Sequence, residues 1–145
     1  MLICRKFSRL LISASLVSTL MGSLSALATP EERWWSKDLD SRLAEAGTNR
    51  VEMEKALSGV STARREGMAF LLENMPVADL KSLSSTFLLE NVDLAYEAWE
   101  KSPWHGAVTK ELFFNDVLPY ACVNEQRDPW RAKLHEICLP IVASC

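Results

Sequence analysis

Residues 84–101 read SSTFLLENVDLAYEAWEK, and this stretch decides the fold. Its apolar residues recur at intervals of three and four, which is the spacing of one face of an α-helix. Ser84 stands directly before the pattern, where its hydroxyl can accept a hydrogen bond from a backbone N–H of the first turn. We therefore expect the longest helix of the chain here. Its buried face is predicted to carry Leu88, Val92, Ala95 and Trp99, with Phe87, Leu94 and Ala98 beside them.

The sequence before this helix shows the same spacing in three shorter stretches. Gly47 is expected to end the first helix, because glycine readily adopts the left-handed conformation that follows a helix. Asn49 can cap the second helix, with Glu52 three residues on as its capping-box partner. Pro76 ends the third helix, since proline lacks an N–H and disfavours helix at the residue before it. A short turn over residues 78–83 then leads to the long helix.

The sequence after the long helix changes more often between helix and loop. Proline and glycine mark residues 102–106 as a loop, and a shorter helix is expected near residues 110–117. Asp128-Pro129 predicts the start of a last helix, which Pro140 should kink or end. No stretch alternates as a β-strand does. We therefore predict an all-α fold, an irregular array of about six short helices.

The first 28 residues have the pattern of a cleaved secretory signal peptide. Arg5, Lys6 and Arg9 precede an uncharged apolar stretch over residues 10–20, and small residues follow at 26–28. The alternative is a retained membrane anchor, but serine, threonine and glycine interrupt the apolar run, which is shorter than the ~20 residues of a span. We therefore predict an exported protein, periplasmic or extracellular, whose helical domain covers residues 29–145.

Charge excludes some classes of partner. Cleavage would remove three basic residues and no acidic one, leaving 13 Lys and Arg against 19 Asp and Glu and a net charge of about −6. Nucleic acids and anionic membranes both select clusters of Lys and Arg. We therefore expect neither as a partner, and no stable membrane span after signal cleavage, because no later stretch is apolar enough.

Three cysteines would remain after cleavage, Cys122, Cys138 and Cys145. A disulfide between Cys122 and Cys138 would close a loop of about 16 residues and contribute ~3 kcal/mol in the loop-entropy model. The alternative is that all three are unpaired thiols, since unpaired cysteine packs as a small hydrophobic residue. Both interpretations stay open at this point.

Two constellations resemble sites only in residue type. Cys122, Asp128 and His135 are the residues of a thiol nucleophile with its acid and base, but a working triad is assembled in space rather than along one segment. His135 and Cys138 lie one helical turn apart, yet lack the paired close ligands of structural zinc sites. We assign no catalytic, cofactor-binding or metal-binding residue.

The long helix carries a stripe of acidic residues, which we interpret as a solvated surface. The stripe comprises Glu90, Asp93, Glu97 and Glu100.

Two segments resemble a known family. The first reads FLLENMP over residues 70–76 and continues through Asp79-Leu80 to FLLENVDLAYEA over residues 87–98. The second reads FFNDVLPY over residues 113–120 and is followed by Asn124-Glu125, Arg127-Asp128 and Trp130-Arg131. Together they resemble the helical region that precedes the catalytic core of bacterial exported transglutaminase-like proteins. The match runs from about residue 49 to the end of the chain.

The resemblance implies a papain-like core with a Cys-His-Asp centre after this region, and the chain stops at Cys145, about where that core is expected. None of its cysteines matches the family's nucleophile. We therefore expect this chain alone to be no enzyme but a non-catalytic N-terminal helical module, truncated or separately encoded. Its partner would be a transglutaminase-like core in cis or in trans. Gln126 stands where the family pattern has a second basic residue.

The second segment is dense in polar side chains, which we interpret as a structural polar hub that fixes the turn and docks on the neighbouring core. Ligand binding is the alternative role for these residues. The predicted members are Asn115, Asp116, Tyr120, Asn124, Glu125, Arg127 and Arg131. A different function stays open as well, a free-standing exported adaptor that binds proteins through this hub or through an exposed pair of tryptophans, Trp34 and Trp35.

Overall fold

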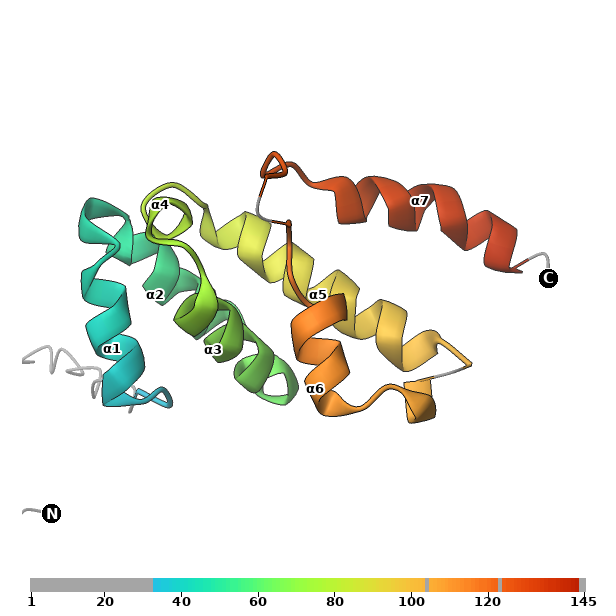
Figure 1. Ribbon diagram of the computed structural model, residues 1–145, viewed down its shortest axis with the longest axis horizontal. Coiled ribbons are helices and arrows are strands. Elements are labelled where there is room, and N and C mark those ends of the chain that lie inside the picture. The colour runs from blue at the N-terminus through green and yellow to red at the C-terminus, as the bar shows by residue number, and fades with distance from the viewer. Residues whose placement is uncertain (1–32, 104, 123, 144–145) are drawn as a thin grey trace, which may run out of the picture. The chain divides into compact units, whose positions relative to one another are not determined.

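The computed structural model describes residues 33–103, 105–122 and 124–143, and this part is built from helices with no strand (Figure 1). The predicted all-α class is therefore confirmed. The predicted signal peptide lies outside the described residues, as do Trp104 and Cys145. The α-helices are α1 (Lys37–Ala44), α2 (Arg50–Gly59), α3 (Arg65–Asn74), α4 (Val77–Leu80), α5 (Ser85–Lys101), α6 (Lys110–Leu112) and α7 (Trp130–Ala143), and a π-helical turn (Phe113–Val117) continues α6.

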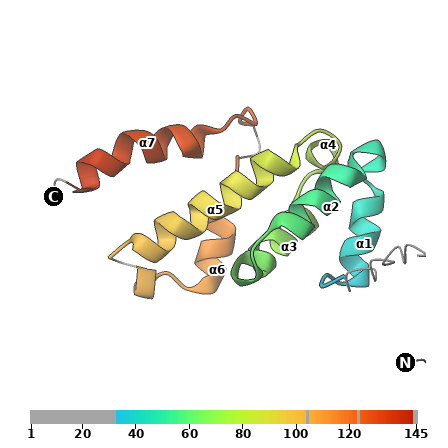
Figure 2. The ribbon, with the colours of Figure 1, turned by 180° about the vertical axis from the view of Figure 1, so that it is seen from behind.

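Helix α5 is the longest element and contacts most of the others. Ser84 caps it as predicted, because its Oγ accepts a hydrogen bond of 3.2 Å from the N–H of Phe87. The helix packs against α2 and α3 and also contacts α7, which lies on its other side in both views (Figures 1 and 2). Of the predicted stripe, Leu88, Val92 and Ala95 are fully buried.

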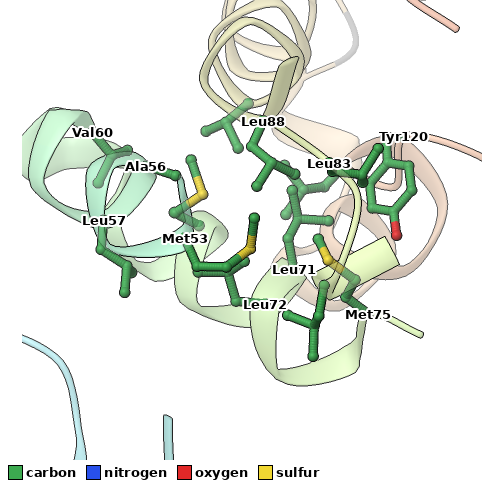
Figure 3. Close-up of a cluster of buried hydrophobic side chains, with 14 of the residues drawn as sticks. Met53, Ala56, Leu57, Val60, Leu71, Leu72, Met75, Leu83, Leu88 and Tyr120 are labelled. Atoms are coloured by element: carbon green, nitrogen blue, oxygen red, sulfur yellow. The ribbon is translucent and has the colours of Figure 1, made fainter. Parts of the chain in front are cut away.

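The core lies among α1, α2, α3 and α5. Figure 3 shows Met53 and Leu57 of α2 facing Leu72 of α3, with Leu88 of α5 above them. Each of these side chains is fully buried. Burying one such side chain stabilises the fold by roughly 1.5–3 kcal/mol. Tyr120 lies at the edge of the same cluster, beside Leu83.

For the turn between α1 and α2, the sequence predicted the role of Gly47 correctly and the roles of Asn49 and Glu52 incorrectly. Gly47 has a positive φ of 59°, as expected for the residue after a helix. Asn49 makes no capping bond; its amide instead donates to the carbonyls of Leu80 and Leu83 at 2.9 Å each. Glu52 is also not a capping-box partner, since its carboxylate accepts from the N–H and the hydroxyl of Ser85. Both predictions assumed a local bond, and tertiary contacts with residues 80–85 replaced it.

Two prolines behave differently. Met75, directly before Pro76, is extended and ends α3 as predicted, but the expected turn over residues 78–83 contains the short helix α4. Helix α7 does not end at Pro140 but runs on to Ala143. The described helices include none that is both long and apolar enough to cross a membrane.

Candidate functional site

A buried carboxylate connects three segments of the chain. Asp79 lies in α4 and is only 6% exposed. It accepts a hydrogen bond of 2.7 Å from the hydroxyl of Tyr120, which follows the π-helical turn. It also accepts bonds of 3.0 and 3.2 Å from Nε of Arg127, in the loop before α7, whose Nη2 lies 3.0 Å away. The carboxylate therefore ties both ends of residues 120–127 to α4.

Contact with Asp79 favours the protonated forms of Tyr120 and Arg127, which are the forms that can donate to a carboxylate. Burial, together with the bond to Asp79, raises the pKa of Tyr120, so the phenol stays a neutral donor. The hydrogen bond that Arg127 donates to Asp79 raises the pKa of Arg127, so the guanidinium stays charged. A buried polar network is stabilising when its members are satisfied, as they are here.

A second buried side chain holds the end of the π-helical turn. Asn91 of α5 is 5% exposed, donates to the carbonyl of Leu118 at 2.9 Å and accepts from Nε of Arg131 at 3.0 Å. Nη2 of Arg131 donates to the carbonyls of Val117 (2.7 Å) and Pro119 (3.0 Å). The last carbonyls of a helix lack partners within it and favour a cation. Arg131 supplies both the donors and the charge, at the expense of a pKa that burial lowers.

Trp130 adds a third contact at the start of α7. Its indole Nε1 donates to the carbonyl of Tyr120 at 2.6 Å, and the Arg131 guanidinium lies 4.5 Å from its ring centroid. The first turn of α7 is therefore fixed to the segment that Asp79 and Asn91 already hold. We call Asp79, Asn91, Tyr120, Arg127, Trp130 and Arg131 together the polar hub.

The structure places the predicted hub residues in two groups. Tyr120 is buried, and Arg127 and Arg131 are half-buried against Asp79 and Asn91, whereas the other four are exposed. Among these four, Glu125 accepts from the N–H of Cys122 at 2.9 Å, and Asn115 donates to the carbonyl of Glu111. The surface group comprises Asn115, Asp116, Asn124 and Glu125.

Sequence reasoning missed the anchors of the hub. Asp79 is the one charged residue between Glu73 and Lys81, and Asn91 interrupts the buried face of α5. For Asn91 the available signal was a polar residue at a position that periodicity assigns to the core, because a buried polar group needs a partner. Asp79 lay in a predicted turn and gave no such signal. The partners lie 41 to 48 positions away for Asp79 and 40 for Arg131 with Asn91.

An open cleft of about 720 Å³ lies beside the hub. Asn115 and Asp116 of the π-helical turn form one wall, and Trp130 and Arg131 of α7 line it from the other element. Asp116, Glu125 and Asp128 give it three carboxylates. The remaining lining residues are Val117, Pro119, Ala121, Cys122 and Gln126.

Cys122 lies apart from the two α7 residues His135 and Cys138. Cys122 lines this cleft, whereas His135 and Cys138 line a separate groove between α5 and α7. Both thiols are free and exposed, so the Cys122–Cys138 disulfide is not formed in this structure. Nε2 of His135 lies 3.7 Å from a carboxylate oxygen of Glu97 rather than beside Cys122. Among the described residues, no three His, Cys, Asp or Glu side chains gather as metal ligands.

The two neighbouring tryptophans, Trp34 and Trp35, make their contacts within this chain. Trp34 and Trp35 are half-buried, not exposed as the adaptor hypothesis assumed. Their indoles donate to the carbonyl of Leu57 at 3.0 Å and to Oδ1 of Asp40 at 3.3 Å. Arg65 also lies 5.1 Å from the centroid of Trp34. These contacts attach the start of the described chain to α1, α2 and α3.

Comparison with protein families, curated proteins and solved structures finds no match to this chain.

Proposed function

We propose that this chain is a non-catalytic helical module of an exported transglutaminase-like protein, and that it packs on a catalytic core present in cis or in trans. The motifs over residues 70–98 and 113–131 support the family, and the pattern of residues 1–28 supports export. The core, which carries the Cys-His-Asp centre, would perform acyl transfer or amide hydrolysis. This chain would support that core without touching the substrate.

One observation carries the proposal: the family-like segment divides into an inner half and an outer half. Its inner residues are satisfied within the chain by Asp79 and Asn91. Its outer residues are exposed, and three of them, Asn115, Asp116 and Glu125, line the 720 Å³ cleft. A segment that only fixed its own turn would need the inner half alone. The outer half is therefore assigned to contact with a partner.

The chemistry of the cleft indicates what the partner presents there. Three carboxylates line the cleft, of which Asp128 already lies 3.3 Å from Nζ of Lys133 in the same chain. Arg131 is committed to Asn91 and two backbone carbonyls. Apolar side chains such as Val117 and Pro119 lie between the carboxylates. A core surface with a basic side chain beside apolar ones fits this lining, since opposite charges across an interface steer association and set its register.

The test uses a purified transglutaminase-like core from a bacterial exported protein, prepared without its own helical region. Titration of this core with the chain should show binding by calorimetry and a higher melting temperature of the core. Asp116→Lys should weaken binding at least tenfold, because it reverses a charge in the cleft. Glu73→Lys makes the same charge change at an exposed position of α3 outside the cleft, and should bind as the unaltered chain does.

Two results would contradict the proposal. One is an unaltered chain that does not bind the core, and the other is an equal loss of binding in Glu73→Lys and Asp116→Lys, which would indicate a general charge effect. For the version in cis, the reading frame after codon 145 should encode a Gly-x-Cys-Trp-like segment followed by His and Asp. A frame without it leaves only the version in trans.

A free-standing adaptor is the second candidate, and the completeness of the hub favours it. Asp79, Asn91 and their partners all belong to this chain, so no second protein is needed to satisfy them. A cooperative thermal transition of the purified chain, with no core present, is the expected result for an adaptor. A product that keeps helical circular dichroism but lacks fixed tertiary packing would instead indicate a module that needs its core.

A further inference from the structure

The last helix, α7, exposes two large apolar side chains to solvent. Leu134 and Ile137 of α7 are 48% and 63% exposed. They follow Trp130 at intervals of four and three, so all three share one face of the helix. The other large exposed apolar side chains of the described residues, Val51, Val77 and Leu112, lie singly on three different helices. Single exposed apolar residues are ordinary, whereas adjacent ones mark a contact surface.

A groove of about 400 Å³ runs beside this face, between α5 and α7. Leu94 and Ala98 line it from α5, and Leu134 and Cys138 line it from α7. The charges at its edge are paired within the chain, since Glu97 bonds Lys101 and faces His135. The groove therefore suits an apolar occupant and offers no unpaired charge to a polar one.

The structure assigns this surface to a second copy of the same chain: we propose that two copies pair through α7, antiparallel, about a two-fold axis. Such a contact needs one patch that is complementary to itself. Helix α7 meets that condition, because it carries the protruding side chains, Leu134 and Ile137, and also forms one wall of the groove that receives them.

The exposed charges of α7 favour the antiparallel arrangement. Lys133 and Glu136 are both exposed and lie on the same edge of the apolar face. Nζ of Lys133 also lies 3.3 Å from the Asp128 carboxylate of its own chain, but this side chain is 65% exposed and an ammonium has donors for a second carboxylate. An antiparallel pair brings the same edge of the two helices together. When the axis passes between Leu134 and Ile137, Lys133 of one copy lies within about two residues, or ~3 Å of helix rise, of Glu136 in the other. Symmetry forms this pair of opposite charges twice.

The size of the surface predicts a weak dimer. The 14 residues of α7 span about 21 Å. A contact of that length stays below the ~1,200 Å² of total buried surface that stable complexes reach. The pairing should therefore depend on protein concentration. The groove shares Trp130 and Arg131 with the acidic cleft, but Leu134 lines only the groove and Ile137 lines neither, so substitutions at Leu134 or Ile137 test the pairing separately from the proposed core-binding function.

Sedimentation velocity of the full chain in reducing buffer, over a range of concentrations, tests the proposal. The unaltered chain should show a reversible monomer–dimer equilibrium. Ile137→Asp should weaken it at least tenfold, because it places an unpaired charge in the contact. Val51→Asp is the matched control: Val51 is 58% exposed on α2, and its substitution should leave the equilibrium unchanged. Unchanged circular dichroism of both variants would show that each is folded.

A charge exchange tests the antiparallel register. Lys133→Glu should weaken pairing a few-fold, as expected for exposed ion pairs, and adding Glu136→Lys should restore it. A chain that stays monomeric at the highest soluble concentration overturns the proposal. So does pairing that Ile137→Asp leaves intact, or that Val51→Asp weakens equally. Failure of the double variant to restore pairing overturns the antiparallel arrangement. Loss of core binding in Ile137→Asp would assign the groove to the core instead.

Discussion

The region of α1, α2, α3 and α5 and the region over residues 113–131 reach their structure by different means. In the first, apolar side chains at helical spacing meet in one core, where α2 packs on α5 and α1 on α3 as well as on their neighbours in the chain. In the second, a π-helical turn, a loop and the start of α7 are held by hydrogen bonds from Asp79 and Asn91. Many interchangeable apolar contacts stabilise the first region, whereas a few irreplaceable polar ones position the second.

Removing the carboxylate of Asp79 should break the hub region most severely. Asp79→Ala leaves the Arg127 guanidinium and the Tyr120 hydroxyl without their acceptor. Breaking a buried ion pair in this way costs about 3–5 kcal/mol, which urea unfolding would measure. Glu73→Ala removes an exposed carboxylate from α3 and should change stability by no more than about 0.5 kcal/mol. Similar losses in the two variants would contradict the role of Asp79.

Truncating a buried side chain of the apolar region should destabilise the fold, by an amount that depends on how far the neighbouring residues fill the cavity that is left. Leu88→Ala, at a fully buried position of α5, should lower the free energy of unfolding by about 2–5 kcal/mol. Leu112→Ala removes the same atoms at a position that is half exposed. Its effect should stay within about 0.5 kcal/mol. Chemical denaturation of both variants compares them directly, and equal effects would show that the core is placed incorrectly.

Close packing between α3 and α5 offers a third test. A Cβ added at Gly67 would lie 2.8 Å from both Cε2 and the hydroxyl oxygen of Tyr96, so the ring must move. Gly67→Ala should therefore destabilise by about 1–2 kcal/mol, because overpacking outweighs the gain in helix propensity. Gly59→Ala meets only the flexible end of Leu89, at 3.1 Å. A smaller melting-temperature loss for Gly67→Ala than for Gly59→Ala would refute this packing.

The smallest expected effect concerns the contact of Glu52 with the start of α5, and this contribution to stability is lost only in acid. Lys55, followed by the N–H and hydroxyl of Ser85, lowers the pKa of Glu52 from the ordinary 4.5 to about 2. Because the folded-state pKa is the lower one, this contribution to stability is present above about pH 4.5 and is lost as the pH falls towards 2. Glu52→Gln lacks it, so the stability difference from the unaltered chain should shrink over that window.

Urea unfolding at a series of pH values measures this difference. Glu73→Gln, at an exposed position of α3, serves as the control and should follow the unaltered chain across the series. A difference between the chain and Glu52→Gln that stays constant from pH 5 to pH 2 would show that the contact with Ser85 does not shift the protonation of Glu52.

Much of the apolar region could be predicted from the sequence, because its signals are local. The spacing of Leu88, Val92 and Ala95, the cap at Ser84 and the stop at Gly47 each depend on neighbours within about one or two turns. The predictions at Asn49 and Glu52 were wrong for the same reason: both residues satisfy local capping rules, yet they bond to residues 31 to 34 positions away.

The hub could be predicted only in part. The density of polar residues over 115–131 indicated hydrogen bonding. In the structure Tyr120 and Arg127 share the carboxylate of Asp79, whereas Arg131 bonds Asn91 and two backbone carbonyls. The anchors Asp79 and Asn91 were missed, because nothing in their own segments says which distant donor they face.

The sequence by itself determined the class of fold, the position of the long helix and its N-terminal cap, because helix formation follows from side-chain spacing and backbone bonds over a few residues. Only the tertiary structure decided which polar residues are buried together and which remain at the surface. It also decided that α7 would leave Leu134 and Ile137 exposed beside a groove. The physical reason is that burial and pairing depend on segments distant in the chain, which meet only when the apolar core brings them together.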